Sequence, residues 1–107
     1  MKILVIRFSS LGDVVLSTVI FPNLRAHYPE AEISVLTRAE YAALFDANPF
    51  VNHVFLFDPS RQPFSQLVKE IRDMKFDIII DLQGNVRSWY LRLVAGARRA
   101  VVVEKLA

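Results

Sequence analysis

The chain has 107 residues, enough for one hydrophobic core and too few for two, so we expect a single domain over residues 1–107. It contains no cysteine, which excludes disulfide bonds and thiolate metal sites and is typical of a cytoplasmic protein. The net charge of +2 does not predict nucleic-acid binding. At the amino terminus, no apolar run is long enough for an export signal or a membrane span.

The first half of the chain alternates apolar and amphipathic segments. Residues 2–7 form an apolar run that predicts a buried strand. A helix is predicted from Gly12 or Asp13 through about Tyr28. Because proline removes a backbone hydrogen bond, Pro22 predicts a kink or break near residues 18–22. The next elements are predicted as a strand, a short helix and a strand over residues 32–37, 39–47 and 51–57.

The second half of the chain continues this alternation. Residues 64–74 place apolar side chains at helical spacing, which predicts an amphipathic helix that covers one face of a sheet. The isoleucine run within residues 76–82 predicts a strand buried on both faces. The elements that follow are predicted as a loop over residues 83–85, a helix through about Ala95 and a strand over residues 100–103.

Strands that alternate with helices predict an α/β fold with a doubly wound, Rossmann-like parallel sheet, most simply in the strand order 3-2-1-4-5. In this order the first and fourth strands are neighbours. The loops that follow them would then lie side by side at the carboxyl edge of the sheet, where open α/β sheets bind ligands. We therefore expect a site between residues 9–13 and 83–88.

Asp13 is the carboxylate that follows the first of these loops. It has two interpretations that spacing alone cannot separate. As a structural residue it caps a helix and is stabilised by free backbone N–H groups and by the helix dipole. As a functional residue it is a general base, which needs an exposed carboxylate within reach of a hydroxyl group.

The two loops hold the other candidate ligand-binding residues. In the first loop they are Ser9, Ser10 and Gly12. In the second loop they are Gln83, Gly84, Asn85, Arg87 and Ser88. Backbone donors of the first loop could approach a phosphate or a sugar. The Arg87 guanidinium of the second loop could bind a carboxylate or a phosphate. Arg87 could equally be an ordinary surface arginine. No GxGxxG motif and no Walker A lysine follow the first strand.

Other polar and aromatic residues have less specific interpretations. Asp81, at the end of the fourth strand, is expected to accept hydrogen bonds from the adjacent loop. Trp89 and Tyr90 could stack on a sugar or pack in the core or at an interface. His27 and His53 have no partner at ligand spacing, so neither a metal site nor a cofactor is predicted.

Four segments carry a resemblance to a known family. They are residues 1–18, 28–33, 48–51 and 76–88, of which the last reads Phe-Asp-Ile-Ile-Ile-Asp-Leu-Gln-Gly-Asn-Val-Arg-Ser. In order and spacing they resemble the amino-terminal part of the lipopolysaccharide heptosyltransferases, glycosyltransferase family 9. The resemblance covers the whole chain, and its first and last segments are the most specific.

The resemblance implies the amino-terminal, acceptor-side domain of a two-domain GT-B enzyme, with the nucleotide-sugar domain absent from these residues. It implies metal-free, inverting transfer of heptose from ADP-heptose to an anionic inner-core sugar of lipopolysaccharide, in the cytoplasm or at the inner membrane surface. Asp13 matches the position of the proposed catalytic base of the family, and Ser9, Ser10 and Arg87 would help to hold the acceptor. The 107 residues alone would be inactive.

Competing functions make different demands on the sequence. A non-catalytic nucleotide-binding or interaction module fits the same fold and stays open. An oxidoreductase-type domain would show more glycine after the first strand and an acidic residue at the end of the second, where Thr37 and Arg38 stand. A receiver-like signalling domain would need paired acidic residues where Arg7 stands.

Overall fold

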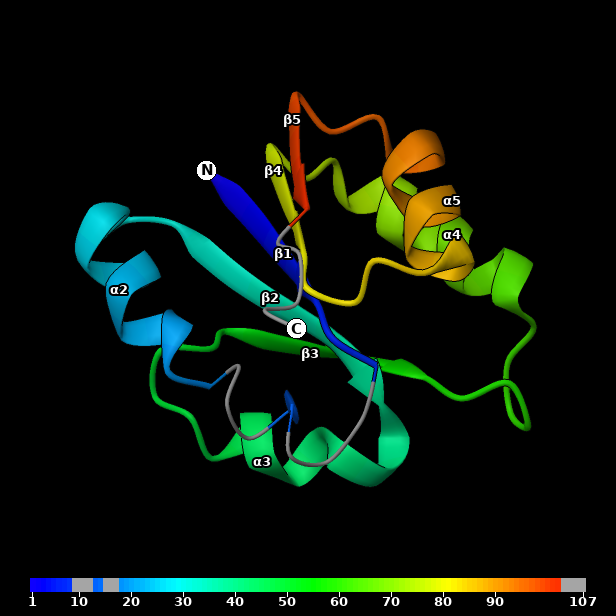
Figure 1. The fold of residues 1–107 in the computed structure, drawn as a ribbon, viewed down its shortest axis with the longest axis horizontal. Coiled ribbons are helices and arrows are strands. Elements are labelled where there is room, and N and C mark those ends of the chain that lie inside the picture. The colour runs from blue at the N-terminus through cyan, green and yellow to red at the C-terminus, as the bar shows by residue number, and fades with distance from the viewer. Residues whose placement is uncertain (9–12, 15–17, 103–107) are drawn as a thin grey trace.

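The computed structural model describes residues 1–8, 13–14 and 18–102. They form a five-stranded sheet with the order β3-β2-β1-β4-β5, and every pairing is parallel. The strands are β1 (Lys2–Ile6), β2 (Glu32–Arg38), β3 (His53–Phe57), β4 (Ile78–Asp81) and β5 (Arg99–Val102). The predicted fold class and strand order are therefore confirmed (Figure 1).

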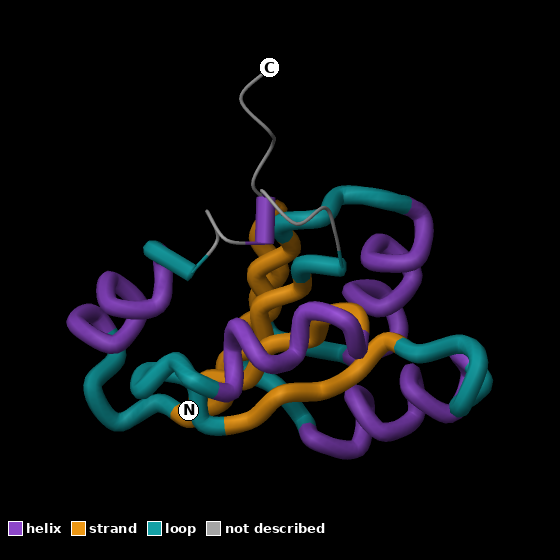
Figure 2. The backbone as a smooth tube through the Cα atoms, turned by 90° about the horizontal axis from the view of Figure 1, so that it is seen from below, coloured by secondary structure: helices purple, strands orange, loops and turns teal. Residues whose placement is uncertain are grey.

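The helices cover the two faces of this sheet, as right-handed crossovers require. On one face lie α2 (Ile20–His27), the 3₁₀ turn η1 (Ala39–Tyr41) and α3 (Ala42–Asp46). On the other face lie α4 (Phe64–Met74) and α5 (Val86–Ala95). Figure 2 shows the strands in the middle with helices on both sides. The connections from β1 through β3 use one face, and those from β3 through β5 use the other.

The alternation of side chains along β1 divides the core into two halves. Ile3 and Val5 pack toward α2 and α3, whereas Leu4 and Ile6 pack toward α4 and α5. All four side chains are completely buried. A shift of register by one residue would exchange the two sets, so burial on both faces fixes the position of β1 and of the residues that follow it.

The predicted break in the first helix is confirmed. Asp13 and Val14 are helical, Thr18 and Val19 form a turn, and α2 begins at Ile20. Residues 15–17 lie outside the described part of the chain. Pro22 is thus in the first turn of α2, where its missing N–H group would have had no partner within the helix.

Other boundaries shift by a few residues. β3 begins at His53 rather than at residue 51, because the side-chain Oδ1 of Asn52 accepts the hydrogen bond from Ile33 N, at 2.8 Å. Residues 39–47 divide into η1 and α3 instead of one helix. β4 is shorter than predicted, since Phe76 packs in the core without joining the ladder. The predicted bounds of α4 agree with the structure.

On the sheet face that α2 and α3 cover, the described residues leave a groove. Beside α2, this groove of about 450 Å³ lies over the face of β4 and β5. Its apolar lining comes from Ile20, Leu24, Ile78, Ile80, Leu82 and Val101. Parallel sheets are normally covered on both faces. Within this lining Ile78 is buried and packs in the core, whereas Val101 is 47% exposed.

Candidate active site at the carboxyl edge of the sheet

The loops after β1 and β4 lie side by side. Leu82 N donates to Ile6 O at 3.0 Å, and Arg7 N donates to Leu36 O at 3.0 Å, so the chain that leaves β1 stays between its two neighbours. Directly beyond, Phe8 N donates to the side-chain Oε1 of Gln83 at 3.1 Å. The two loops that the strand order places together are therefore in direct contact.

Arg7 holds Asp13 at this edge. The Arg7 side chain is 5% exposed, and its Nη2 lies 2.7 Å from Oδ2 of Asp13, whose side chain is 35% exposed. Its Nη1 donates to the backbone oxygen of Leu82. Because an uncompensated charge in this position would be costly, the ion pair both balances the charge of the buried cation and fixes the carboxylate, while Arg7 Nε has no hydrogen-bond partner among the described residues. Asp13 thus has one side toward a buried guanidinium and remains accessible from outside.

Sequence reasoning did not identify Arg7 as a functional residue. Its only local signal was a charge directly after the apolar run that forms β1. Such a residue is usually interpreted as the end of a strand at the surface. Its burial follows from the strands on both sides of β1, which the local sequence does not specify.

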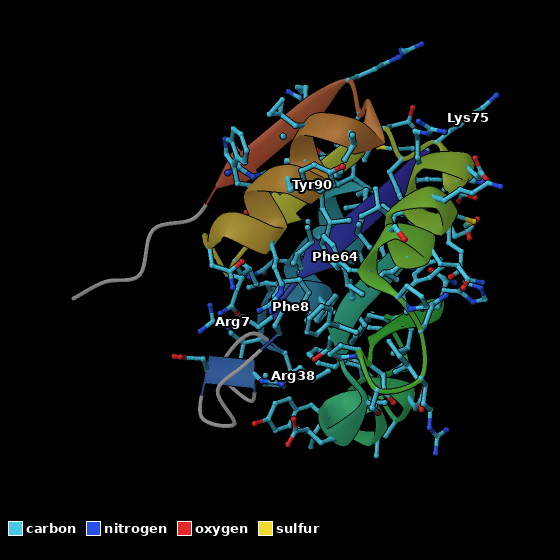
Figure 3. The ribbon with its side chains drawn as sticks, turned by 90° about the vertical axis from the view of Figure 1, so that its right-hand side faces the viewer. Arg7, Phe8, Arg38, Phe64, Lys75 and Tyr90 are labelled. Atoms are coloured by element: carbon cyan, nitrogen blue, oxygen red, sulfur yellow. The ribbon has the colours of Figure 1, made fainter. Side chains whose placement is uncertain are left out.

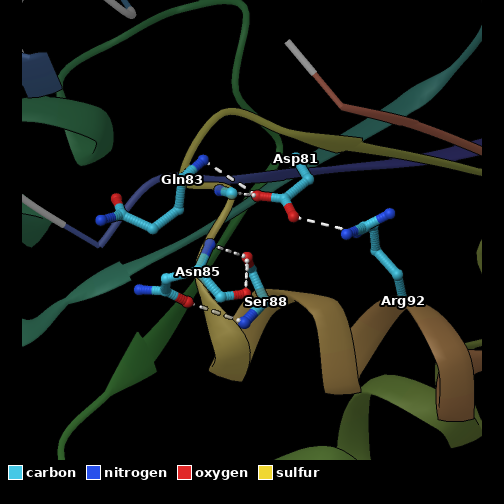
Figure 4. A network of polar contacts seen from close by, with 6 residues as sticks. Asp81, Gln83, Asn85, Ser88 and Arg92 are labelled. Carbon is cyan, nitrogen blue, oxygen red and sulfur yellow. Dashed lines mark hydrogen bonds and ion pairs between the residues drawn. The ribbon is translucent and has the colours of Figure 1, made fainter. Parts of the chain in front are cut away.

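Asp81 holds the loop after β4 in place, as expected. Its carboxylate is completely buried, and Oδ1 accepts hydrogen bonds from Gln83 N at 2.9 Å and Gly84 N at 2.8 Å. The other oxygen forms an ion pair with Arg92 Nε at 2.9 Å (Figure 4). Gly84 has a φ of +63°, a left-handed conformation that suits glycine. These contacts make Asp81 a structural anchor.

Asn85 and Ser88 cap α5. Asn85 Oδ1 accepts from Ser88 N at 2.9 Å, and Ser88 Oγ accepts from Asn85 N at 2.9 Å, which is a reciprocal capping box (Figure 4). Ser88 is completely buried, whereas Asn85 is exposed. Of the two predicted ligand-binding residues, only Asn85 therefore reaches the surface.

The remaining candidates differ in accessibility. Gly84 and Arg87 are exposed, and Gln83 is half-buried. Ser9, Ser10 and Gly12 lie outside the described residues. The structure thus brings Asp13, Gln83 and the start of α5 to one edge.

Aromatic residues continue the site along α5. Trp89 and Tyr90 are 53% and 46% exposed. With Phe64, Ser65 and Arg87 they line a shallow pocket of about 350 Å³. Tyr90 also contacts Phe64, with ring centroids 6.2 Å apart. Packing of Tyr90 against α4 therefore coexists with an exposed aromatic surface beside Arg87.

Across the described residues, no group of three or more histidine, aspartate or glutamate side chains could hold a metal ion. The same residues include no helix that is long and apolar enough to cross a membrane.

A parallel α/β domain with a carboxylate and an arginine at the carboxyl edge of the sheet belongs to the class of ligand-binding doubly wound folds. No protein-family model matches the chain. It is 31% identical over 99 residues to a Haemophilus influenzae protein to which glycosyltransferase activity is attributed, and the match covers 91% of this chain and 29% of that protein.

Two solved glycosyltransferase structures are similar to this chain in fold. A glycosyltransferase of family 9 from Veillonella parvula superposes with a TM-score of 0.82 and 27% identity, over 92% of this chain and 30% of that one. The Escherichia coli ADP-heptose lipopolysaccharide heptosyltransferase II superposes with a TM-score of 0.82 and 29% identity, over 95% of this chain and 30% of that one.

The resemblance to the heptosyltransferases of glycosyltransferase family 9 is thus confirmed in both sequence and fold. The chain spans about 30% of the length of these proteins.

Proposed function

We propose that residues 1–107 are the amino-terminal, acceptor-side domain of an inverting heptosyltransferase that uses ADP-heptose and the inner core of lipopolysaccharide. The observation that carries the proposal is the accessible carboxylate of Asp13, held by buried Arg7 at the carboxyl edge of the sheet. This pair lies within residues 1–18, one of the segments with the clearest resemblance to the family. We call the longer protein that contains these residues the parent enzyme.

Asp13 acts as the general base in this proposal. One carboxylate oxygen takes the proton from the acceptor hydroxyl while the hydroxyl oxygen attacks the anomeric carbon of heptose. The bond between that carbon and the diphosphate breaks on the opposite side, so ADP leaves and the configuration inverts. Arg7 holds the carboxylate in position for this step, since its guanidinium is itself held by the Leu82 oxygen.

The other proposed contacts divide between two domains. Arg87 and the loop residues Ser9, Ser10, Gly12, Gln83, Gly84 and Asn85 would contact the acceptor, with Ser88 acting through the cap of α5. The nucleotide would bind mainly to the second domain of the parent enzyme. We place the reaction in the cytoplasm, with contact to the inner membrane surface where the lipid-linked acceptor is found.

The proposal is tested by titrating ADP and ADP-heptose into the 107-residue chain and into the parent enzyme, followed by a transfer assay. We expect the parent enzyme to bind both nucleotides and to form a product of inverted anomeric configuration. If it binds neither nucleotide and transfers no sugar, a non-catalytic interaction module is the better description. Retention of configuration would refute Asp13 as a base in single-step transfer.

Replacing Arg87 by alanine in the parent enzyme should raise KM for the acceptor more than KM for ADP-heptose. Arg87 is exposed and belongs to the domain assigned to the acceptor, so its loss removes charge-assisted hydrogen bonds from that substrate. Steady-state kinetics with each substrate varied in turn measure the difference. Arg72→Ala, in the last turn of α4, is the matched control. A larger effect on the donor would contradict the assignment.

The 107-residue chain alone should transfer no sugar and should not bind ADP with micromolar affinity. Inversion needs donor and acceptor to be held together, and this advantage is lost when one binding surface is missing. Isothermal titration calorimetry and a radiolabel transfer assay provide the measurements. Sugar transfer by the chain itself would show that the nucleotide site lies within these residues.

A further inference from the structure

Two arginines approach one phenylalanine ring at the carboxyl edge of the sheet. The Cζ of Arg38 lies 6.0 Å from the centroid of the Phe57 ring, and the Cζ of Arg87 lies 5.3 Å from it. Arg38 is the register partner of Phe57 on the neighbouring strand, whereas Arg87 comes from the first turn of α5. Residues from three distant parts of the chain thus bring two cations to one aromatic ring.

Phe57 is a fixed support for both guanidinium groups. Its side chain is 5% exposed, and its ring contacts Phe8 at 4.8 Å and Phe64 at 5.9 Å between centroids. A guanidinium that stacks on an aromatic ring keeps its in-plane N–H groups directed away from the ring. The ring therefore orders the two arginines before any ligand arrives.

Charge–charge interactions within the fold do not favour two arginines at one ring. Two like charges that share a ring repel each other. In addition, Arg87 lies in the first turn of α5, where a cation opposes the helix dipole. Neighbouring carboxylates offset the repulsion only in part. Glu40 lies 3.3 Å from Arg38 Nε, but at an exposed position. Asp58, which follows Phe57 in the chain, pairs instead with Arg61 at 3.7 Å and accepts from the hydroxyl group of Ser60. A bound anion would relieve the repulsion.

Phe8 and Arg7 connect the ring that the two arginines share to the candidate base. Phe8, which contacts Phe57, directly follows Arg7, which pairs with Asp13. Arg7 and Phe8 point to opposite faces of the sheet, so the pair with Asp13 and the two stacked arginines flank the same strand end. In Figure 3, Arg7, Phe8 and Arg38 lie toward one end of the molecule, away from Lys75.

We propose that Arg38 and Arg87 together bind one oxyanion, a phosphate or a carboxylate, that belongs to the acceptor. Its assignment to the acceptor depends on the function proposed above, whereas the existence of the oxyanion site does not. The terminal nitrogens of the two guanidinium groups would hold the anion from two sides, with bidentate geometry available to each. An acceptor bound in this way would extend over the end of β1 toward Asp13.

The site is tested by NMR on the ¹⁵N-labelled 107-residue chain, with inorganic phosphate and glucuronate as separate probes. We expect the Nε–Hε signals of Arg38 and Arg87 to shift together, with a midpoint on the order of 1 mM, and the shift to be lost in about 0.5 M NaCl. Arg38→Gln and Arg87→Gln should each weaken binding roughly tenfold, whereas Arg72→Gln should not. The probe that binds more tightly identifies the anionic group. Shifts that are absent for both probes, or that persist in both variants, would overturn the site.

A kinetic measurement separates the acceptor from the donor as the source of the anion. In the parent enzyme, Arg38→Gln should raise KM for the acceptor and leave KM for ADP-heptose unchanged. A rise in the donor KM instead would overturn the assignment to the acceptor. Failure of the proposed function would give a different result from failure of the oxyanion site. Sugar transfer would then survive Asp13→Asn, while Arg38 and Arg87 would still bind phosphate.

Discussion

In the parent enzyme, Asp13→Asn should lower turnover by roughly 100-fold or more, the range usual for loss of a general base. Asparagine keeps the shape of the side chain and its contact with Arg7, but it cannot accept the proton of the acceptor hydroxyl. Because Asp13 is 35% exposed but its partner Arg7 is buried, we expect a loss of stability of about 1–3 kcal/mol, between the ranges for exposed and buried ion pairs, and the fold should remain intact. The measurement is kcat together with circular dichroism of the variant.

Two controls separate catalysis from structure. Asp46→Asn makes the same chemical change at an exposed position at the end of α3 and should leave turnover unchanged. In Asp13→Ala, added formate should restore part of the activity, because a small carboxylate can replace a missing base but not a missing helix cap. If Asp13→Asn had near-parental turnover, Asp13 would not be the general base and its role would be limited to the ion pair with Arg7.

The second large effect concerns stability. Asp81→Asn should lower the free energy of unfolding of the 107-residue chain by about 3 kcal/mol, because removal of one partner of a buried ion pair leaves the other uncompensated. The single oxygen of the amide could still accept from Gln83 N and Gly84 N. Its NH₂ group, however, would face the Arg92 guanidinium, and neither group could accept a hydrogen bond from the other.

Urea denaturation followed by circular dichroism measures this change. Asp73→Asn, at an exposed position in α4, should change stability by less than about 0.5 kcal/mol. Equal unfolding midpoints for Asp81→Asn and the unmodified chain would mean that the loop after β4 holds its conformation without the carboxylate.

The fold could be predicted because its signals are local. The isoleucines of β4 indicated a strand buried on both faces, and the apolar spacing of residues 64–74 matched α4. The alternation of strands and helices, with right-handed crossovers, then left one simple strand order. Differences arose where side chains replaced backbone partners, as Asn52 does beside β3.

The site could be predicted only in outline. Its edge followed from the strand order, and Asp13 and Arg87 were identified as candidates. The burial of Arg7 and the approach of Arg38 to Phe57 depend on neighbours that are distant in the sequence. Such contacts leave no periodic or compositional trace, so they become visible only in the folded chain.

The pairing of Arg7 with Asp13 has a consequence for how these positions evolve. A lineage that lost Asp13 alone would retain a buried guanidinium with too little negative charge around it, and one that lost Arg7 alone would release the carboxylate from its position. Either single step is disadvantageous, so the two residues should be inherited as a unit. Among relatives, substitutions at position 13 should therefore be accompanied by substitutions at position 7.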